Sequence, residues 1–86
     1  MPTSEDGYWL VVVGSEYGTL AVELENLRLL GYVVDVTKLD GSVITGAVMG
    51  QSEAALILEG WDNQAGYPNG ELVAVDMDTI AGLWVP

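Results

Sequence analysis

The sequence predicts a mainly β protein in which an N-terminal strand and a short helix precede a strongly bent antiparallel barrel of five strands. Three observations support this fold class. Short runs rich in β-branched residues follow one another closely from residue 32 onward. The first two runs are joined by Asp40-Gly41, a hairpin signal because glycine adopts a positive φ without steric cost. Gly46 and Gly50 interrupt the second run, where a missing side chain permits the sharp bend that a small barrel requires.

The N-terminal third predicts a tail and a strand before the helix. Residues 1–7 are polar and are expected to form a disordered tail. Residues 8–13 are aromatic and β-branched, which predicts a strand that ends at Gly14. The sequence leaves three places open for this strand: it completes the barrel, extends the sheet of a neighbouring subunit, or lies across the helix.

A helix is predicted over at least residues 19–30, with Ser15 as a cap at its start and Gly31 as its C-terminal stop. Its expected buried face consists of leucines at helical spacing: Leu20, Leu24, Leu27 and either Leu29 or Leu30. The alternation of apolar and polar residues between positions 20 and 25 is also typical of a strand, but the length and the closing glycine favour the helix.

Five barrel strands are expected at about residues 32–39, 42–50, 54–60, 71–75 and 80–85. Residues 61–70 form a polar loop in this prediction, with Asn69-Gly70 as a second tight turn before the fourth strand. Residues 76–79 are expected to form a single helical turn before the fifth strand. One domain therefore spans residues 1–86, divided into the tail at 1–7, the strand and helix at 8–31 and the barrel at 32–86.

The composition is strongly acidic, because thirteen Asp and Glu residues oppose only Arg28 and Lys38, for a formal net charge of −11. Such a charge repels phosphate backbones and anionic membrane surfaces and attracts basic proteins. It also keeps a protein soluble, which is the simpler explanation. No apolar run is long enough to span a bilayer and the acidic start differs from a signal peptide, so a soluble, cytoplasmic protein is expected.

Neither catalysis nor cofactor binding is expected. The chain has no cysteine and no histidine, which excludes disulfides, thiolate and imidazole metal ligands, and the usual base for a nucleophile. The glycines at 41, 46 and 50 lack the Lys and Ser or Thr that end a phosphate-binding loop. Asp76 and Asp78 lack a third ligand, so they are expected to solvate a turn rather than to bind a metal ion.

The helix followed by five bent strands, with Asp40-Gly41 at the first hairpin and Gly46 five residues later, resembles the Sm-like family, which includes the bacterial Hfq proteins. The resemblance covers residues 19–86; the segment 40–46 is similar to the family's first motif, 54–58 to its third strand and 75–86 to its second motif. Other small SH3-type barrels share this hairpin pattern. The resemblance implies free edges on the fourth and fifth strands, which pair between subunits and close a ring.

The RNA pocket that the resemblance implies lacks its usual residues here. Sm-like proteins line it with an Asn or Asp and an aromatic after the second strand, and with basic residues before the fifth. This chain has Gln51-Ser52-Glu53 at the first place and Asp76-Met77-Asp78 at the second. Carboxylates repel phosphate, and without an aromatic side chain no base can stack. Hfq-like RNA binding is therefore the less favoured interpretation.

An acidic variant of the same fold gives another hypothesis. The Rho-binding antiterminator (Rof) proteins resemble an acidic Sm-like barrel that occupies the RNA-binding surface of a basic partner. This chain shares their acidic balance and the order of helix and hairpin. It is thus a candidate nucleic-acid mimic that inhibits a basic DNA- or RNA-binding protein, and a phage origin would suit such an inhibitor.

Two sets of residues are candidates for contacts with other proteins. Aromatic side chains in a polar loop, ringed by acids, predict an anchor for a partner, although the same aromatics would also serve to cover the open end of the barrel. The partner-binding candidates are Trp61, Asp62, Tyr67, Asp76 and Asp78. The candidates for a subunit interface are Leu72, Val73, Ile80, Leu83 and Trp84. The leading hypothesis is a non-enzymatic barrel that self-associates, as a ring homo-oligomer, and acts as a protein-interaction module.

Overall fold

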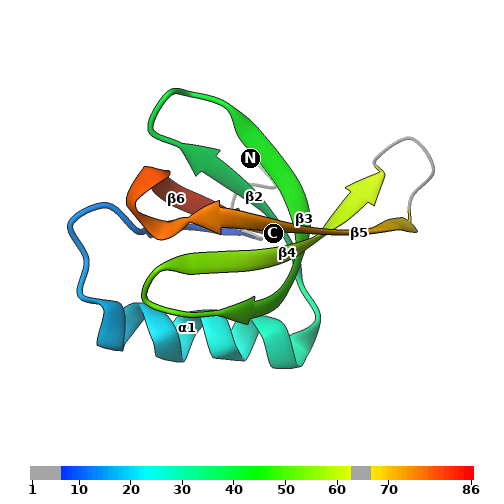
Figure 1. Cartoon of the computed structure of the whole chain (residues 1–86). Helices are drawn as coiled ribbons and strands as arrows, with labels where there is room; N and C mark the ends of the chain where they lie inside the picture. Colours follow the sequence, from blue (N-terminus) through cyan, green and yellow to red (C-terminus); the bar gives the residue numbers. More distant parts are fainter. Residues whose placement is uncertain (1–6, 63–66) are drawn as a thin grey trace.

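The computed structural model describes residues 7–62 and 67–86, with Asp62, Tyr67 and Pro68 given by their backbone only. Residues 1–6 of the expected tail lie outside this part of the chain. The described residues form six strands, one α-helix and one 3-10 turn, whose path through the molecule is drawn in Figure 1. Their bounds are β1 Tyr8–Val11, α1 Tyr17–Leu30, β2 Val33–Lys38, β3 Val43–Gln51, β4 Ala55–Asp62, β5 Tyr67–Asp76, η2 Met77–Thr79 and β6 Ile80–Val85.

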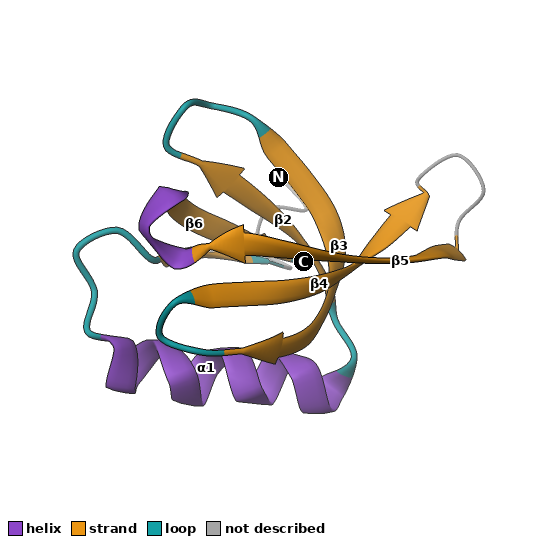
Figure 2. Ribbon diagram, in the orientation of Figure 1, coloured by secondary structure: helices purple, strands orange, loops and turns teal. Residues whose placement is uncertain are grey.

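The strands form one strongly bent antiparallel sheet in the order β1-β6-β2-β3-β4-β5. Helix α1 runs along one side of this sheet and contacts β3, while the β4–β5 hairpin projects beyond the other strands (Figure 2). The strands β1 and β5 are therefore the two edges of the sheet among the described residues. This architecture confirms the prediction of a mainly β protein in which a strand and a short helix precede five bent antiparallel strands.

One hydrophobic core joins the helix to the sheet. Every strand from β2 to β6 contributes apolar side chains to it, and so do the helix and the 3-10 turn. The buried members are Val12, Leu20, Leu24, Leu27, Val34, Val36, Val48, Leu56, Leu58, Val75, Met77, Ile80, Leu83 and Val85. No charged or polar side chain is buried among the described residues, so the side-chain packing between the helix and the sheet is apolar.

Helix α1 buries a single leucine face, as its spacing predicts. Leu20, Leu24 and Leu27 are buried, and they recur three or four positions apart because that spacing brings side chains to one face of a helix. Gly31 ends the helix in the left-handed conformation with φ 73° and donates its backbone N–H to the carbonyls of Leu27 and Arg28. Both the helix and its C-terminal stop are thus confirmed.

Two details of the predicted helix are wrong. Glu16, rather than Ser15, precedes the first helical residue, and the Ser15 hydroxyl instead donates a hydrogen bond of 2.9 Å to the carbonyl of Val11. Leu29 and Leu30 are both exposed, and Leu27 is the last buried leucine of the helix. The buried face therefore ends one turn before the helix does.

The β2–β3 hairpin has the tight turn that Asp40-Gly41 predicts. Gly41 has φ 92°, and the Asp40 carboxylate accepts hydrogen bonds from the backbone N–H of Ser42 at 2.9 Å and from its hydroxyl at 2.6 Å. These hydrogen bonds stabilise the charged carboxylate and hold the pKa of Asp40 below its ordinary value. The turn consequently fixes the register in which Thr37 faces Val43.

The β4–β5 hairpin corrects the predicted polar loop. Strand β4 continues to Asp62 and β5 begins at Tyr67, so that Trp61 pairs with Pro68 and Asp62 with Tyr67. The expected turn at Asn69-Gly70 lies inside β5, where Gly70 has φ 82° and the register shifts by a bulge. A turn signal in the sequence therefore marks an irregularity within a strand, because β5 already pairs with β4 from Tyr67, ahead of Asn69-Gly70.

Strand β1 completes the sheet, which decides among the three places left open by the sequence. Tyr8 pairs with Val85 and Val11 with Gly82 along β6. The Trp9 ring lies against Gly82, where an added Cβ atom would be 2.4 Å from it. Trp84 lies against Gly7 in the same way, at 2.7 Å. Gly82 and Gly7 thus leave room for the indole rings of Trp9 and Trp84, which pack between β1 and β6.

Gly46 is required by the close approach of β3 to β4. It pairs with Gly60, and a Cβ atom on Gly46 would be 2.5 Å from the backbone carbonyl oxygen of Glu59. A backbone atom can yield only if the strand moves, so we expect Gly46→Ala to lower the free energy of unfolding by about 1–3 kcal/mol. Urea unfolding measures this loss.

Gly50→Ala is the matched control for this substitution. Gly50 lies in the same strand, beside the register shift between Val48 and Gly50, but the nearest atom to its added Cβ would be 4.0 Å away. We expect its free energy of unfolding to change by no more than about 0.5 kcal/mol. Equal losses in the two variants would show that close approach is not the reason for Gly46.

Candidate functional site

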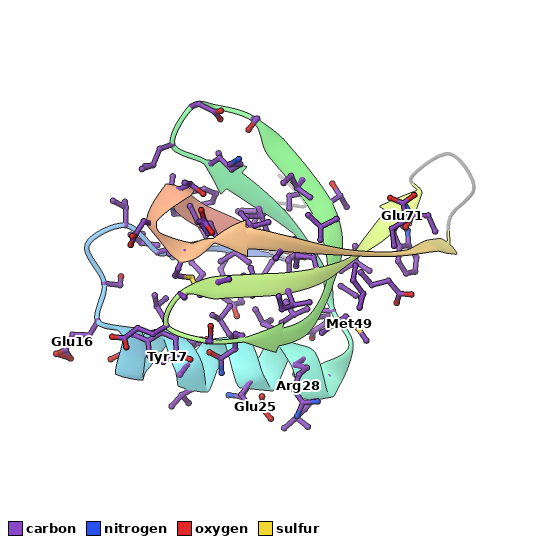
Figure 3. All side chains as sticks on the ribbon, in the orientation of Figure 1. Glu16, Tyr17, Glu25, Arg28, Met49 and Glu71 are labelled. Carbon is purple, nitrogen blue, oxygen red and sulfur yellow. The ribbon has the colours of Figure 1, made fainter. Side chains whose placement is uncertain are left out.

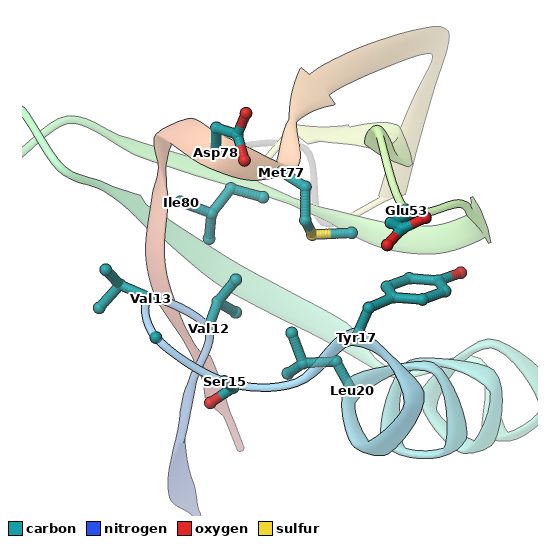
Figure 4. Close-up of a pocket in the computed structure, with 10 residues that line it drawn as sticks. Val12, Val13, Ser15, Tyr17, Leu20, Glu53, Met77, Asp78 and Ile80 are labelled. Atoms are coloured by element: carbon teal, nitrogen blue, oxygen red, sulfur yellow. The ribbon is translucent and has the colours of Figure 1, made fainter.

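A pocket lies at the end of the barrel where three segments of the chain meet. These segments are the turn between β1 and α1, the loop between β3 and β4, and the 3-10 turn between β5 and β6 (Figure 4). The pocket has a volume of about 300 Å³, at the lower end of the range of ligand sites. It is therefore large enough to receive one side chain of a partner.

The pocket has an apolar floor and an acidic rim. Val12, Leu20 and Ile80 form buried parts of its lining together with Met77, while Val13, Gly14 and Ser15 form one wall. Glu53 lies on one side beside the Tyr17 ring, and Asp78 lies on another side above Ile80 (Figure 4). Both carboxylate residues are exposed, so their charges face solvent at the mouth of the pocket.

Hydrogen bonds between the segments fix the shape of the pocket. The backbone N–H of Met77 donates to the carbonyl of Ala54 at 2.8 Å and so ties the 3-10 turn to the β3–β4 loop. The Tyr17 hydroxyl donates to Oε1 of Gln51, which positions the aromatic ring at the edge of the pocket. The lining is consequently preformed rather than assembled by a ligand.

The two basic side chains of the protein leave the rim unneutralised. Arg28 forms an ion pair with Glu25 on the outer face of α1, pointing away from the sheet in Figure 3. Their hydrogen bonds lower the pKa of Glu25 and raise that of Arg28. Lys38 lines a smaller neighbouring pocket with Asp78, yet no ion pair joins them in the described part of the chain. In the described part of the chain the rim carboxylates are therefore held in no ion pair, although Lys38 lies near Asp78.

The structure brings together the two segments that the resemblance associates with an RNA pocket. Glu53 of the first segment and Asp78 of the second line the same pocket, with Met77 between them. Asp78 was a predicted partner-binding residue, whereas Val12, Tyr17, Leu20 and Ile80 were missed as lining residues because no local pattern links the N-terminal strand to this end of the barrel. Asp76 is exposed and lies outside the lining.

The other predicted partner-binding residues lie away from the pocket. Trp61 is half-buried within β4 rather than in a loop. Asp62 and Tyr67 follow at the end of β4 and the start of β5, and their side chains fall outside the described part of the structure. An aromatic anchor made by Trp61 and Tyr67 together stays a prediction.

The predicted interface residues divide between surface and core. Leu72 on β5 is exposed and Val73 beside it is half-buried. Ile80 and Leu83 are buried in the core of their own chain, which corrects the expectation that they face a second subunit. Trp84 is half-buried and pairs with Trp9 of β1. The edge of β6 that the resemblance leaves free is therefore already occupied by β1.

Other kinds of site find little support in residues 7–62 and 67–86. No group of three or more acidic side chains gathers there in a way that would hold a metal ion. Helix α1 is too short and too polar to cross a membrane, and no other described helix meets that requirement.

The comparison with known structures identifies the fold. The crystal structure at 1.55 Å of Hfq, a pleiotropic translational regulator, superposes with a TM-score of 0.63, covering 84% of this chain and 97% of the Hfq chain at 18% sequence identity. No protein-family model matches the chain, and no curated protein matches it. The protein thus has the Sm-like fold, a small barrel preceded by a helix. At this level of identity the likeness establishes the fold alone.

Proposed function

We propose that this protein is a non-enzymatic, acidic Sm-like interaction module that associates with further copies of itself through the free edge of β5. The observation that supports this proposal is the unpaired edge of a ten-residue strand. An exposed edge presents a row of backbone donors and acceptors that another strand can pair with. Leu72 adds an apolar side chain at this edge, since 66% of its surface is exposed.

The partner strand for β5 in this proposal is β1 of the next copy. The ring that the resemblance implies would use the fifth barrel strand, but β1 covers β6 along Tyr8–Val11. β1 is the other edge strand of the sheet, and its Val11 side chain is exposed. Pairing of two different edges is heterologous, so it repeats from copy to copy and gives a ring when the rotation between copies closes.

Replacement of Leu72 by lysine tests this association. Leu72 faces Glu59 across the β4–β5 ladder, so Leu72→Lys places opposite charges side by side within one chain and is expected to leave the fold intact. A lysine on an edge strand disfavours pairing with another chain. By multi-angle light scattering at micromolar concentration, we expect the wild type to have a mass of roughly five to seven subunits, and the variant a lower mass.

Val43→Lys is the control for this experiment, because Val43 is similarly exposed, at 57%, but lies on β3 inside the sheet. We expect it to keep the mass of the wild type. Measurements at low and moderate salt are needed, since a net charge of −11 on each copy opposes association at low ionic strength. A wild type that is a strict monomer in both conditions would rule out the proposal.

A second candidate function is inhibition of a basic nucleic-acid-binding protein. The acidic rim of the pocket, formed by Glu53 and Asp78, favours it over RNA binding, because these carboxylates would repel a phosphate. Binding of this kind weakens as salt is added, since it depends on attraction between opposite charges.

A further inference from the structure

We propose that the acid-rimmed pocket binds a basic segment of a partner protein, which inserts one apolar side chain into the floor and places flanking lysines or arginines against Glu53 and Asp78. This inference rests on the proposed role as a protein-interaction module, but it concerns a surface separate from the edge of β5. The lining of the pocket indicates this occupant. The apolar side chain matches the apolar floor, and the lysines or arginines match the acidic rim.

The floor accounts for the apolar side chain. Val12, Leu20, Met77 and Ile80 are almost completely buried by the protein itself, so the surface that they leave open is small and apolar. Water gains few hydrogen bonds against such a surface, and an apolar side chain that displaces it is favoured. A volume of about 300 Å³ admits one side chain of leucine or phenylalanine size rather than a folded element.

The rim accounts for the flanking basic residues. Glu53 and Asp78 lie at the mouth, and no hydrogen bond or ion pair within the described part of the chain engages either carboxylate. A cation that approaches them does not have to displace an existing partner. The net charge of −11 draws basic segments toward the protein and keeps acidic ones away. The negative charge of the protein and the shape of the pocket thus both favour a basic segment with one apolar side chain.

Methionine methyl resonances report on this site without a known partner. Met77 lines the pocket, whereas Met49 lies near the opposite end of α1 from Tyr17 (Figure 3) and is exposed. The probe is a nine-residue amidated peptide with one leucine between lysines, titrated into the full-length protein labelled at its methionine methyl groups. We expect the Met77 methyl signal to shift with saturation and the Met49 signal to stay in place.

Two altered peptides test the two parts of the occupant. Replacing the leucine by glycine removes the apolar anchor and is expected to weaken binding about tenfold. Replacing the lysines by glutamates is expected to abolish the Met77 shift, because the rim then repels the peptide. If the glycine peptide binds as tightly as the leucine peptide, the pocket floor is not used and the inference fails.

Two double variants of the protein test the rim. Glu53→Gln with Asp78→Asn removes both rim charges and is expected to weaken binding of the leucine peptide about fivefold. Glu59→Gln with Glu71→Gln is the matched control, because it also removes two of the thirteen acids but on the β4–β5 hairpin. We expect the control to bind nearly as the wild type does, and equal weakening in both would overturn the inference.

The outcomes distinguish failure of this inference from failure of the proposed function. A Met77 signal that does not move overturns the pocket, while the mass measured with Leu72→Lys reports on the edge of β5 independently. Movement of Met49 alone would also count against the pocket, because it would place the peptide on another surface.

Discussion

Leu24→Ala is expected to lower the free energy of unfolding by about 3–5 kcal/mol, among the largest losses that we expect from a single truncation in this chain. Leu24 is fully buried in the middle of the leucine face of α1. Its truncation removes buried apolar surface and leaves a cavity between the helix and the sheet. A domain of this length has a total stability of about 4–13 kcal/mol, so the variant loses a large part of it.

Leu29→Ala is the control for this experiment, because it makes the same chemical change on the same helix. Leu29 is 68% exposed, and its truncation is expected to change the free energy of unfolding by less than about 0.5 kcal/mol. Urea unfolding followed by circular dichroism gives both values. If Leu29→Ala proved as costly as Leu24→Ala, the assignment of the buried face would be wrong.

Gly82→Ala is expected to lower the free energy of unfolding by about 3 kcal/mol and to release β1 from the sheet. The added Cβ would lie 2.4 Å from the Trp9 ring and 2.7 Å from the backbone carbonyl oxygen of Leu10. Rotation of the indole can relieve the first contact, but only movement of β1 can relieve the second. Hydrogen exchange of the backbone amides of residues 8–11 should therefore become faster, along with the loss of stability.

Gly18→Ala supplies the comparison, since an added Cβ at Gly18 would meet no atom within 4 Å. Gly18 lies in the first turn of α1, where alanine favours the helix, so we expect a gain of about 0.5–1 kcal/mol. The exchange of residues 8–11 should be the same as in the wild type. Unchanged exchange in Gly82→Ala would mean that the close approach of the Leu10 backbone to Gly82 is not needed to hold β1 in place.

The sequence predicts those parts of the fold that depend on local patterns. Leu20, Leu24 and Leu27 repeat at helical spacing, and Gly31 and Gly41 adopt the positive φ values that end the helix and turn the first hairpin. These features follow from neighbouring residues and can be recognised one segment at a time. For the same reason the 3-10 turn at Met77–Thr79 agrees with the prediction of a short helical turn.

The parts that the sequence does not predict depend on contacts between distant segments. Asn69-Gly70 has the composition of a tight turn, yet the pairing of Trp61 with Pro68 extends both strands past it. The candidate interface at Ile80 and Leu83 rested on a strand edge, but both side chains are buried in the core, one on each side of the register shift in the β2–β6 pairing. Of the pocket, the sequence could indicate Glu53 and Asp78 through the resemblance, because each lies in a recognisable loop.

The place of β1 in the sheet has a consequence for the order in which the molecule assembles. Thr37 meets Val43 across a single tight turn, whereas Tyr8 meets Val85 only after nearly the whole chain has been brought together. Closing the longer loop costs about 2 kcal/mol more in chain entropy. Contacts of long sequence separation form slowly unless the rest of the fold is already present. Docking of β1 is accordingly a late step, and until it occurs the backbone of β6 is open to any strand that reaches it first.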